Sequence, residues 1–285
     1  MLIVPHHPTA TWRVDNFQAP AGSTLGVSVT PGASNVKGAW TQMFSAATVA
    51  NDVHGFYLYV GSASTSAASK PMIFDIGIDP AGGTSYTAII TDFIVGGPSG
   101  TTSQGIRQHF FPMFIKAGSS VAVRSQTANA TAGTMRVAMR LYGNLSQPEA
   151  FRVGTFSEKI GAVASSLGVS FTPGSTGVWG TRVSLGSTVN DLWWWQLGYQ
   201  IDNATVNAEV TDIELSVGDG TTFQVISTHR LITTTSEVAN GTHHPHLHPL
   251  ESYMPLAAGS TLYVRGMCSA APTTGYNCNV IGVGG

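Results

Sequence analysis

The sequence predicts an all-β protein made of two tandem, jelly-roll-like antiparallel β-sandwich domains related by an internal duplication. The first observation is a repeated phrase: residues 25–32 (LGVSVTPG) return as residues 167–174 (LGVSFTPG), with seven of eight positions identical. The second is a further repeat at nearly the same distance, since residues 117–124 (AGSSVAVR) return as residues 258–265 (AGSTLYVR). Repetition at a fixed distance indicates a repeated structural unit. The third is the spacing of Gly- and Pro-rich turns between short apolar runs, which is typical of sandwiches.

The duplication divides the chain into an N-terminal arm at residues 1–20, a first β-sandwich at 21–145, and a linker plus second β-sandwich at 146–285. The arm has no counterpart in the second unit. It contains Trp12 and Phe17, and it is expected either to dock on a neighbouring subunit or to lie along its own sandwich.

In the first unit the clearest strand is residues 53–60 (VHGFYLYV), a run of aromatic and branched residues with high β propensity. Residues 71–78 end at the dense turn signal DPAGG, and residues 86–95 alternate apolar and polar side chains before GGP. The remaining strands are expected at 23–30, 41–47, 109–115, 120–125 and 134–142. About eight strands per unit is the number in a jelly roll.

The second unit repeats this plan. Residues 178–185 correspond to the region of Trp40, with Trp179 matched to Trp40, and residues 192–201 correspond to the aromatic strand. An additional strand is expected in the linker at 151–158, and the others at 209–217, 223–231, 252–256, 261–267 and 277–283.

Composition limits the classes of function. Charged residues make up 10% of the chain, against about a quarter in typical domains, while 42% of residues are apolar. A net charge of −2 without a basic cluster argues against nucleic-acid binding. Residues 1–5 are too short for a signal-peptide core, and no stretch is long enough to span a membrane. We therefore expect a soluble protein made in the cytoplasm, with a weakly charged surface largely covered by partners.

Three consecutive tryptophans, Trp193, Trp194 and Trp195, lie in a predicted strand. Because side chains alternate along a strand, Trp193 and Trp195 should share one face and Trp194 the other. One face is expected to be core. The other is expected to form a subunit contact or a platform for stacking sugars. Trp12 in the arm is a further interface or glycan candidate.

A histidine-rich segment supplies His244, His246 and His248, which share one face if the chain is extended. Imidazole is a common transition-metal ligand, so three chains meeting on a threefold axis would be able to hold one ion. The alternative is a rim loop with solvated imidazoles and no cofactor.

The only cysteines, Cys268 and Cys278, flank a turn-rich segment. A hairpin there would place them opposite each other for a disulfide, and the alternative is two half-buried thiols. A cytoplasmic origin favours the thiols.

No catalytic motif occurs, so the chain is expected not to be an enzyme and to have no catalytic residues. Asp52 and Asp191 both precede the aromatic strand of their unit. Their recurrence indicates a role in holding a turn.

Two phrases carry a family resemblance. Residues 74–84 (FDIGIDPAGGT) and 111–124 (FPMFIKAGSSVAVR) resemble phrases in structural proteins of tailed-bacteriophage particles. Those are β-sandwich proteins of the virion: head decoration or cement proteins, and parts of tails and fibres. The resemblance covers both units, and it brings no active site. The triple tryptophan and the histidine-rich segment of the second unit depart from the pattern.

This resemblance implies a non-enzymatic virion structural protein, made in the host cytoplasm and incorporated into the particle. We expect a capsid decoration or cement protein that stabilises joints between major capsid proteins, acting as a homo-oligomer with a trimer favoured. The alternative is a tail, fibre or baseplate component that binds a host receptor or glycan through Trp194 and the histidine-rich segment.

Overall fold

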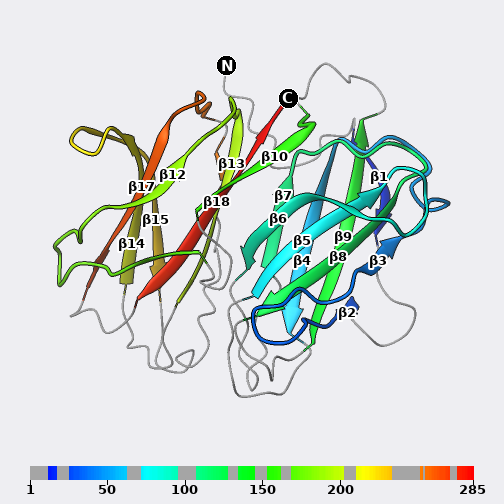
Figure 1. Ribbon diagram of the computed structural model, residues 1–285, viewed down its shortest axis with the longest axis horizontal. Helices are drawn as coiled ribbons and strands as arrows, with labels where there is room; N and C mark the ends of the chain where they lie inside the picture. The colour runs from blue at the N-terminus through cyan, green and yellow to red at the C-terminus, as the bar shows by residue number, and fades with distance from the viewer. Residues whose placement is uncertain are drawn as a thin grey trace.

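The computed structural model describes residues 12–17, 26–62, 72–95, 107–127, 134–144, 153–161, 168–201, 210–232, 251–252, 254–269 and 275–285. Over these ranges the chain forms strands β1 to β18, arranged in four sheets, and contains no helix (Figure 1). Among these residues there is accordingly no helix that could cross a membrane. The predicted all-β fold is confirmed.

The first sandwich has two sheets, here called 1A and 1B. Sheet 1A contains, in order, β1 (Trp12–Phe17), β9 (Met135–Asn144), β4 (Gly55–Ser62) and β7 (Arg107–Phe111), with β2 (Val27–Val29) also paired to β9. Sheet 1B contains β3 (Thr41–Phe44), β8 (Ser120–Thr127), β5 (Met72–Asp79) and β6 (Thr87–Val95). From β2 to β9 the chain passes from sheet to sheet at every connection except the β5–β6 hairpin, which is the jelly-roll order.

The second sandwich repeats this order strand for strand. Sheet 2A contains β10 (Phe156–Ile160), β18 (Tyr276–Gly284), β13 (Trp194–Ile201) and β16 (Glu251–Ser252), with β11 (Val169–Phe171) also paired to β18. Sheet 2B contains β12 (Val183–Ser187), β17 (Thr261–Cys268), β14 (Val210–Gly218) and β15 (Phe223–Ile232). The two tandem jelly rolls predicted from the repeated phrases are therefore present.

Part of the N-terminal arm lies along its own sandwich. Strand β1 pairs antiparallel with β9, so that Trp12 is opposite Asn144 and Phe17 is opposite Arg140. Within the predicted linker, β10 forms an edge strand of sheet 2A. The predicted boundary after residue 145 falls outside the described residues and stays a prediction.

The repeated phrase keeps its glycine for a steric reason. Gly26 and Gly168 have φ angles of 108° and 109°, in the region that disfavours side chains. A Cβ at Gly26 would lie 2.8 Å from the carbonyl oxygen of Val137, and one at Gly168 would lie 2.7 Å from that of Cys278. The glycine lets β2 and β11 run close beside β9 and β18.

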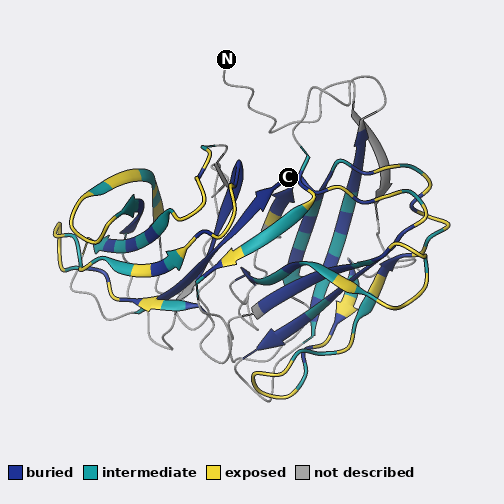
Figure 2. Ribbon diagram, turned by 45° about the horizontal axis from the view of Figure 1, so that its top comes forward, coloured by how far each residue is buried: buried dark blue, intermediate teal, exposed yellow. Residues whose placement is uncertain are grey.

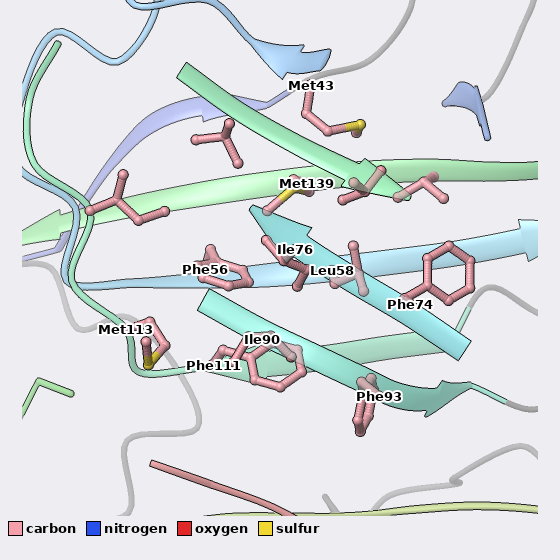
Figure 3. Close-up of a cluster of buried hydrophobic side chains, with 14 of the residues drawn as sticks. Met43, Phe56, Leu58, Phe74, Ile76, Ile90, Phe93, Phe111, Met113 and Met139 are labelled. Carbon is pink, nitrogen blue, oxygen red and sulfur yellow. The ribbon is translucent and has the colours of Figure 1, made fainter. Parts of the chain in front are cut away.

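The core of the first sandwich consists of apolar side chains from both of its sheets (Figure 3). Its residues include Met43, Phe56, Leu58, Phe74, Ile76, Ile90, Phe93, Phe111, Met113 and Met139. This cluster also contains four residues of the second sandwich: Trp193, Trp194, Ile281 and Val283. The core of the second sandwich is built around Trp195, Leu197, Ile213, Leu215, Leu262, Val264, Tyr276 and Val280.

Sheet 2A is covered on both faces where the two sandwiches meet. One face lies on its own core, and the other packs against the β6–β7 side of the first sandwich, with β10, β13 and β18 all contacting β6. All nine residues of β18 are buried, and the strand that runs to the C-terminus is dark blue in Figure 2. This interface joins the two jelly rolls.

Candidate functional site

The three consecutive tryptophans lie at or beside the junction of the sandwiches. Trp194 faces the first sandwich, is fully buried, and has its ring centroid 5.7 Å from that of Phe111. Trp195 points to the opposite face and belongs to the second core, which confirms that one face is core. Trp193 precedes the strand, donates its backbone N–H to the carbonyl of Val283, and joins Trp194 in the first cluster.

The prediction that one tryptophan face serves a glycan or another subunit is therefore wrong for this triplet. Trp193 is 5% exposed, and Trp194 and Trp195 are 0% exposed. The contact that covers Trp194 comes from the other sandwich of the same chain. The expected alternation failed for Trp193 because β13 begins one residue after it.

Hydrogen bonds also cross the same junction. The amide Nε2 of Gln196 lies 2.8 Å from Nδ1 of His109, and both side chains are buried. The hydroxyl of Ser157 donates to the carbonyl of Ile89 at 2.5 Å. A Cβ at Gly198 would come within 2.9 Å of a backbone carbonyl of β6, so the two backbones approach closely there.

Asp92 makes polar contacts with four residues at this junction. It has a φ of 55°, and its N–H donates to the carboxylate of Asp75 at 2.8 Å. Its carbonyl accepts a hydrogen bond from Asn279 at 2.6 Å, and its carboxylate pairs with Lys37 at 2.6 Å and Lys159 at 2.5 Å. Burial alone would raise the pKa of Asp92, but the hydrogen bonds from Lys159 and Lys37 outweigh it and hold the pKa below its ordinary value.

An ion cluster covered by an aromatic ring lies on the outer face of sheet 1B. Asp75, 2% exposed, accepts hydrogen bonds from Arg124 at 2.8 Å and from Lys37 at 2.5 Å. The guanidinium of Arg124 lies 4.4 Å from the centre of the Trp40 ring, within cation–π range. Tyr86 packs beside Trp40 at 5.7 Å between ring centroids. The cluster anchors the loop before β3 to the sheet.

The outer face of sheet 2B carries the corresponding cluster. Glu214 accepts hydrogen bonds from Arg265 at 2.9 and 2.7 Å and from Arg182 at 2.6 Å. Arg265 lies 4.8 Å from the Trp179 ring, and Arg182 lies 4.3 Å from the Phe223 ring. Burial alone would raise the pKa of Glu214, but the two arginines hold it below its ordinary value.

The two clusters keep the same components in exchanged positions. Trp40 and Arg182 both directly precede the next strand of their unit, while Lys37 and Trp179 lie three residues earlier. The aromatic ring and the second cation have therefore changed places between the units. The sequence prediction matched Trp40 with Trp179 but missed the ion pairs. The available signal was the arginine that ends both AGS phrases.

Each cluster holds a loop whose tip exposes one valine. Val36 is 52% exposed and Val178 is 58% exposed, and their N–H groups donate to Ala33 and Ser175 in equivalent turns. Both sandwiches thus present the same apolar side chain at the tip of an anchored loop.

The outer face of sheet 1A is aromatic. The Tyr57 ring lies 4.9 Å from Phe110, 5.6 Å from Tyr142 and 6.0 Å from Tyr59. Tyr57, Tyr59 and Arg140 are half-buried. Burial raises the pKa of Tyr59, with a further contribution from Tyr142. In the second sandwich the face equivalent to this one is the face that packs on β6 and β7.

Asp52 and Asp191 hold equivalent turns, as predicted from their recurrence. Asp52 accepts a hydrogen bond from the N–H of Ala117 at 2.8 Å, and Asp191 accepts one from the N–H of Ala258 at 2.8 Å. Both donors begin an AGS phrase. Each aspartate therefore ties the loop before its aromatic strand to the turn before the repeated strand.

The cysteines are not joined by a disulfide, as in the favoured alternative of two thiols, and they do not lie opposite each other in a hairpin. Cys268 lies in sheet 2B and Cys278 in sheet 2A, because the chain changes sheets between β17 and β18. Both are buried more completely than expected, and Sγ of Cys268 lies 3.3 Å from Oγ1 of Thr211. Burial raises the pKa of the Cys278 thiol.

The predicted metal ligands His244, His246 and His248 lie outside the described residues, as does the side chain of Trp12. Among the described residues, no group of three or more His, Cys, Asp or Glu side chains could hold a metal ion.

No protein-family model and no curated protein sequence matches the chain. Several solved structures are weakly similar. PNGF-II has 10% identity and a TM-score of 0.37 over 91% of this chain and 64% of that chain. The CBM22-1–CBM22-2 tandem domain of Paenibacillus barcinonensis Xyn10C has 12% identity and a TM-score of 0.25, over 98% and 94%. A triple-jelly-roll protein of an archaeal virus turret has 11% identity and a TM-score of 0.23, over 90% and 58%. The chain thus spans less than two thirds of PNGF-II, and the jelly-roll assignment depends on its own strand order.

Proposed function

We propose that the chain is a non-enzymatic structural protein of a bacteriophage virion that binds across joints between major capsid proteins. The observation that carries this proposal is the burial of sheet 2A on both faces. A large apolar interface between domains restricts their relative motion. The fused jelly rolls can therefore hold two neighbouring capsid subunits at a fixed separation, as a cement protein must.

The repeated outer surfaces support a two-point attachment. Val36 and Val178 stand on loops that are anchored by equivalent ion clusters. Two modest contacts made by one body combine into a stronger attachment, because the second contact forms at high effective concentration. The resemblance of residues 74–84 and 111–124 to phage virion proteins suggests that the partners are major capsid proteins.

Cryo-electron microscopy of the intact particle tests the location. Density for two fused jelly rolls over the joints between capsomers is the expected result. Density at the tail tip or in the fibres would overturn the cement role.

A binding assay tests the mechanism. Particles that lack the protein are mixed with wild-type chain, V36D, V178D or the double variant, and bound protein is measured by co-sedimentation. Each single change should weaken binding, and the double change should weaken it by more than either. The control is V189D, since Val189 is 77% exposed and lies outside these loops. Equal binding by all variants would exclude the two-point attachment.

A receptor- or glycan-binding tail component is the second candidate, and one observation favours it. Trp40 and Trp179 are half-buried on the outer faces of sheets 1B and 2B, so a ligand can reach their rings. Trp194 is fully buried and cannot contact a ligand. Glycan-array binding that is lost in W40A or W179A and kept in V189D would support this candidate over the first.

A further inference from the structure

The two sandwiches are joined head to tail. The outer face of sheet 2A covers the β6–β7 side of the first sandwich, so two different surfaces of the repeated unit meet. Because the unit is duplicated, each of these two surfaces has an equivalent on the other sandwich. The outer face of sheet 1A is equivalent to that of sheet 2A, and the β15–β16 side of the second sandwich is equivalent to the β6–β7 side of the first. A contact between two different surfaces is heterologous, and it can be repeated from copy to copy.

The register of the strands identifies equivalent positions on the two A sheets. Tyr59 and Gly198 both lie seven residues after the repeated Asn-Asp pair that precedes β4 and β13. Tyr59 pairs with Ala138 on β9, and Gly198 pairs with Asn279 on β18. Ala138 in sheet 1A is therefore equivalent to Asn279 in sheet 2A, the residue that donates a hydrogen bond to Asp92 on β6.

The opposite side can be matched in the same way. Asp92 on β6 lies beside Asp75, whose carboxylate accepts its N–H. Asp75 and Glu214 are the counterparts at the centre of the two ion clusters, and Glu214 pairs with Thr228 on β15. Thr228 therefore occupies on the second sandwich the position that Asp92 occupies on the first, and it is exposed.

The chemistry of both surfaces suits a contact between folded proteins. The outer face of sheet 1A presents the tyrosine cluster and Arg140, which are residue types enriched at protein interfaces. The β15 side presents Val225, 48% exposed, and Arg230, whose side chain is 68% exposed. A guanidinium placed over a tyrosine ring gains a cation–π contact, and the valine supplies apolar area.

We propose that the outer face of sheet 1A binds a second copy of this chain, through the β15–β16 side of that copy's second sandwich. Repetition of this contact builds a closed ring or a filament, depending on the rotation between copies. Three copies in a ring would place six jelly rolls around one axis. The proposal follows from the duplication and does not depend on attachment to a capsid.

Cross-linking of full-length single-cysteine additions tests this contact. A138C and T228C are prepared separately, mixed in equal amounts, and treated with a short bismaleimide. The native thiols are buried and should react little with the reagent. The wild-type chain, treated in the same way, measures any background cross-linking. Both substitutions replace small side chains at surface or half-buried positions, which keeps the fold intact.

The expected result is a covalent dimer in the mixture and none with either variant alone. The chain carrying both substitutions should give a ladder of oligomers. Self-linking of A138C alone would overturn the proposal, since it would show two copies of sheet 1A facing each other. A mixture that stays monomeric would also overturn it. A positive cross-link combined with failed capsid binding would support this contact and contradict only the proposed cement role.

Discussion

The carboxylate of Asp92 in the first sandwich accepts a hydrogen bond of 2.5 Å from Lys159 in the second. The backbone carbonyl of Asp92 accepts a hydrogen bond from Asn279, and its other carboxylate oxygen pairs with Lys37. Strands β6, β10 and β18 therefore meet at one residue in a left-handed backbone conformation. The fixed relation between the jelly rolls depends on this polar contact as well as on buried tryptophan.

Replacement of Asp92 by asparagine should weaken the junction. Asparagine tolerates a left-handed conformation, so the backbone is preserved while two cations lose their carboxylate. The expected loss is about 1–3 kcal/mol in the free energy of unfolding, measured by urea denaturation. The control is R230Q, because Arg230 pairs with Asp212 inside one sandwich and is mostly exposed. That change should cost clearly less than D92N, because solvent screens an exposed ion pair. Equal losses would show that Asp92 has no special role.

Stability should fall at acid pH. The pKa values of Asp92 and Glu214 are held below their ordinary values of 3.8 and 4.5 in the folded state. Their stabilisation is therefore present above those values, and it is lost as pH falls through the folded-state pKa values. Thermal unfolding between pH 7 and pH 2 should show a decline that begins near pH 4 to 5. In D92N the decline should be smaller, and an unchanged decline would contradict this assignment.

Trp194 and Trp195 should have different effects when truncated. Either change to alanine removes a fully buried ring and should cost about 3–5 kcal/mol. W194A empties the junction, so calorimetry should separate two unfolding transitions, one for each jelly roll. W195A leaves a cavity in the second core and should lower mainly the unfolding temperature of that sandwich. W179A, on an outer face, is the control and should cost only about 1 kcal/mol. A single unchanged transition in W194A would argue against a coupling role.

The two cysteines should behave as protected thiols. The intact mass should not change on reduction, because Cys268 and Cys278 are both free thiols. Ellman's reagent should react slowly with the folded chain and rapidly with both thiols in urea, since burial keeps Cys278 protonated. A mass increase of two hydrogens on reduction would contradict the structure.

Asp52 and Asp191 should contribute equally. Each accepts one 2.8 Å hydrogen bond from the alanine of an AGS phrase. D52N and D191N should each lower the free energy of unfolding by about 0.5–1.5 kcal/mol, and their effects should add because the sites lie in different sandwiches. Chemical denaturation of both single variants and the double variant tests this. Strongly unequal losses would show that the two turns are not equivalent.

Much of the fold was predictable because the signals were local or repeated. The run at residues 53–60 and the turn after residue 79 placed β4 and β5 within two residues. The recurrence of Asp52 and Asp191 indicated a turn role that the hydrogen bonds bear out. The ion clusters were harder to predict, because one cation and the aromatic ring exchange positions between the units and the acids come from strands distant in the sequence.

The sequence by itself determined the duplication, the positions of most strands along the chain and the alternation of side chains within a strand, because these depend on periodicity and turn chemistry. Only the tertiary structure decided that the second face of sheet 2A is buried and that Trp194 contacts Phe111. It also decided that Cys268 and Cys278 belong to different sheets. A period of two residues says which side chains share a face, but it carries no information about what covers that face. In this chain the cover is the other copy of the same unit.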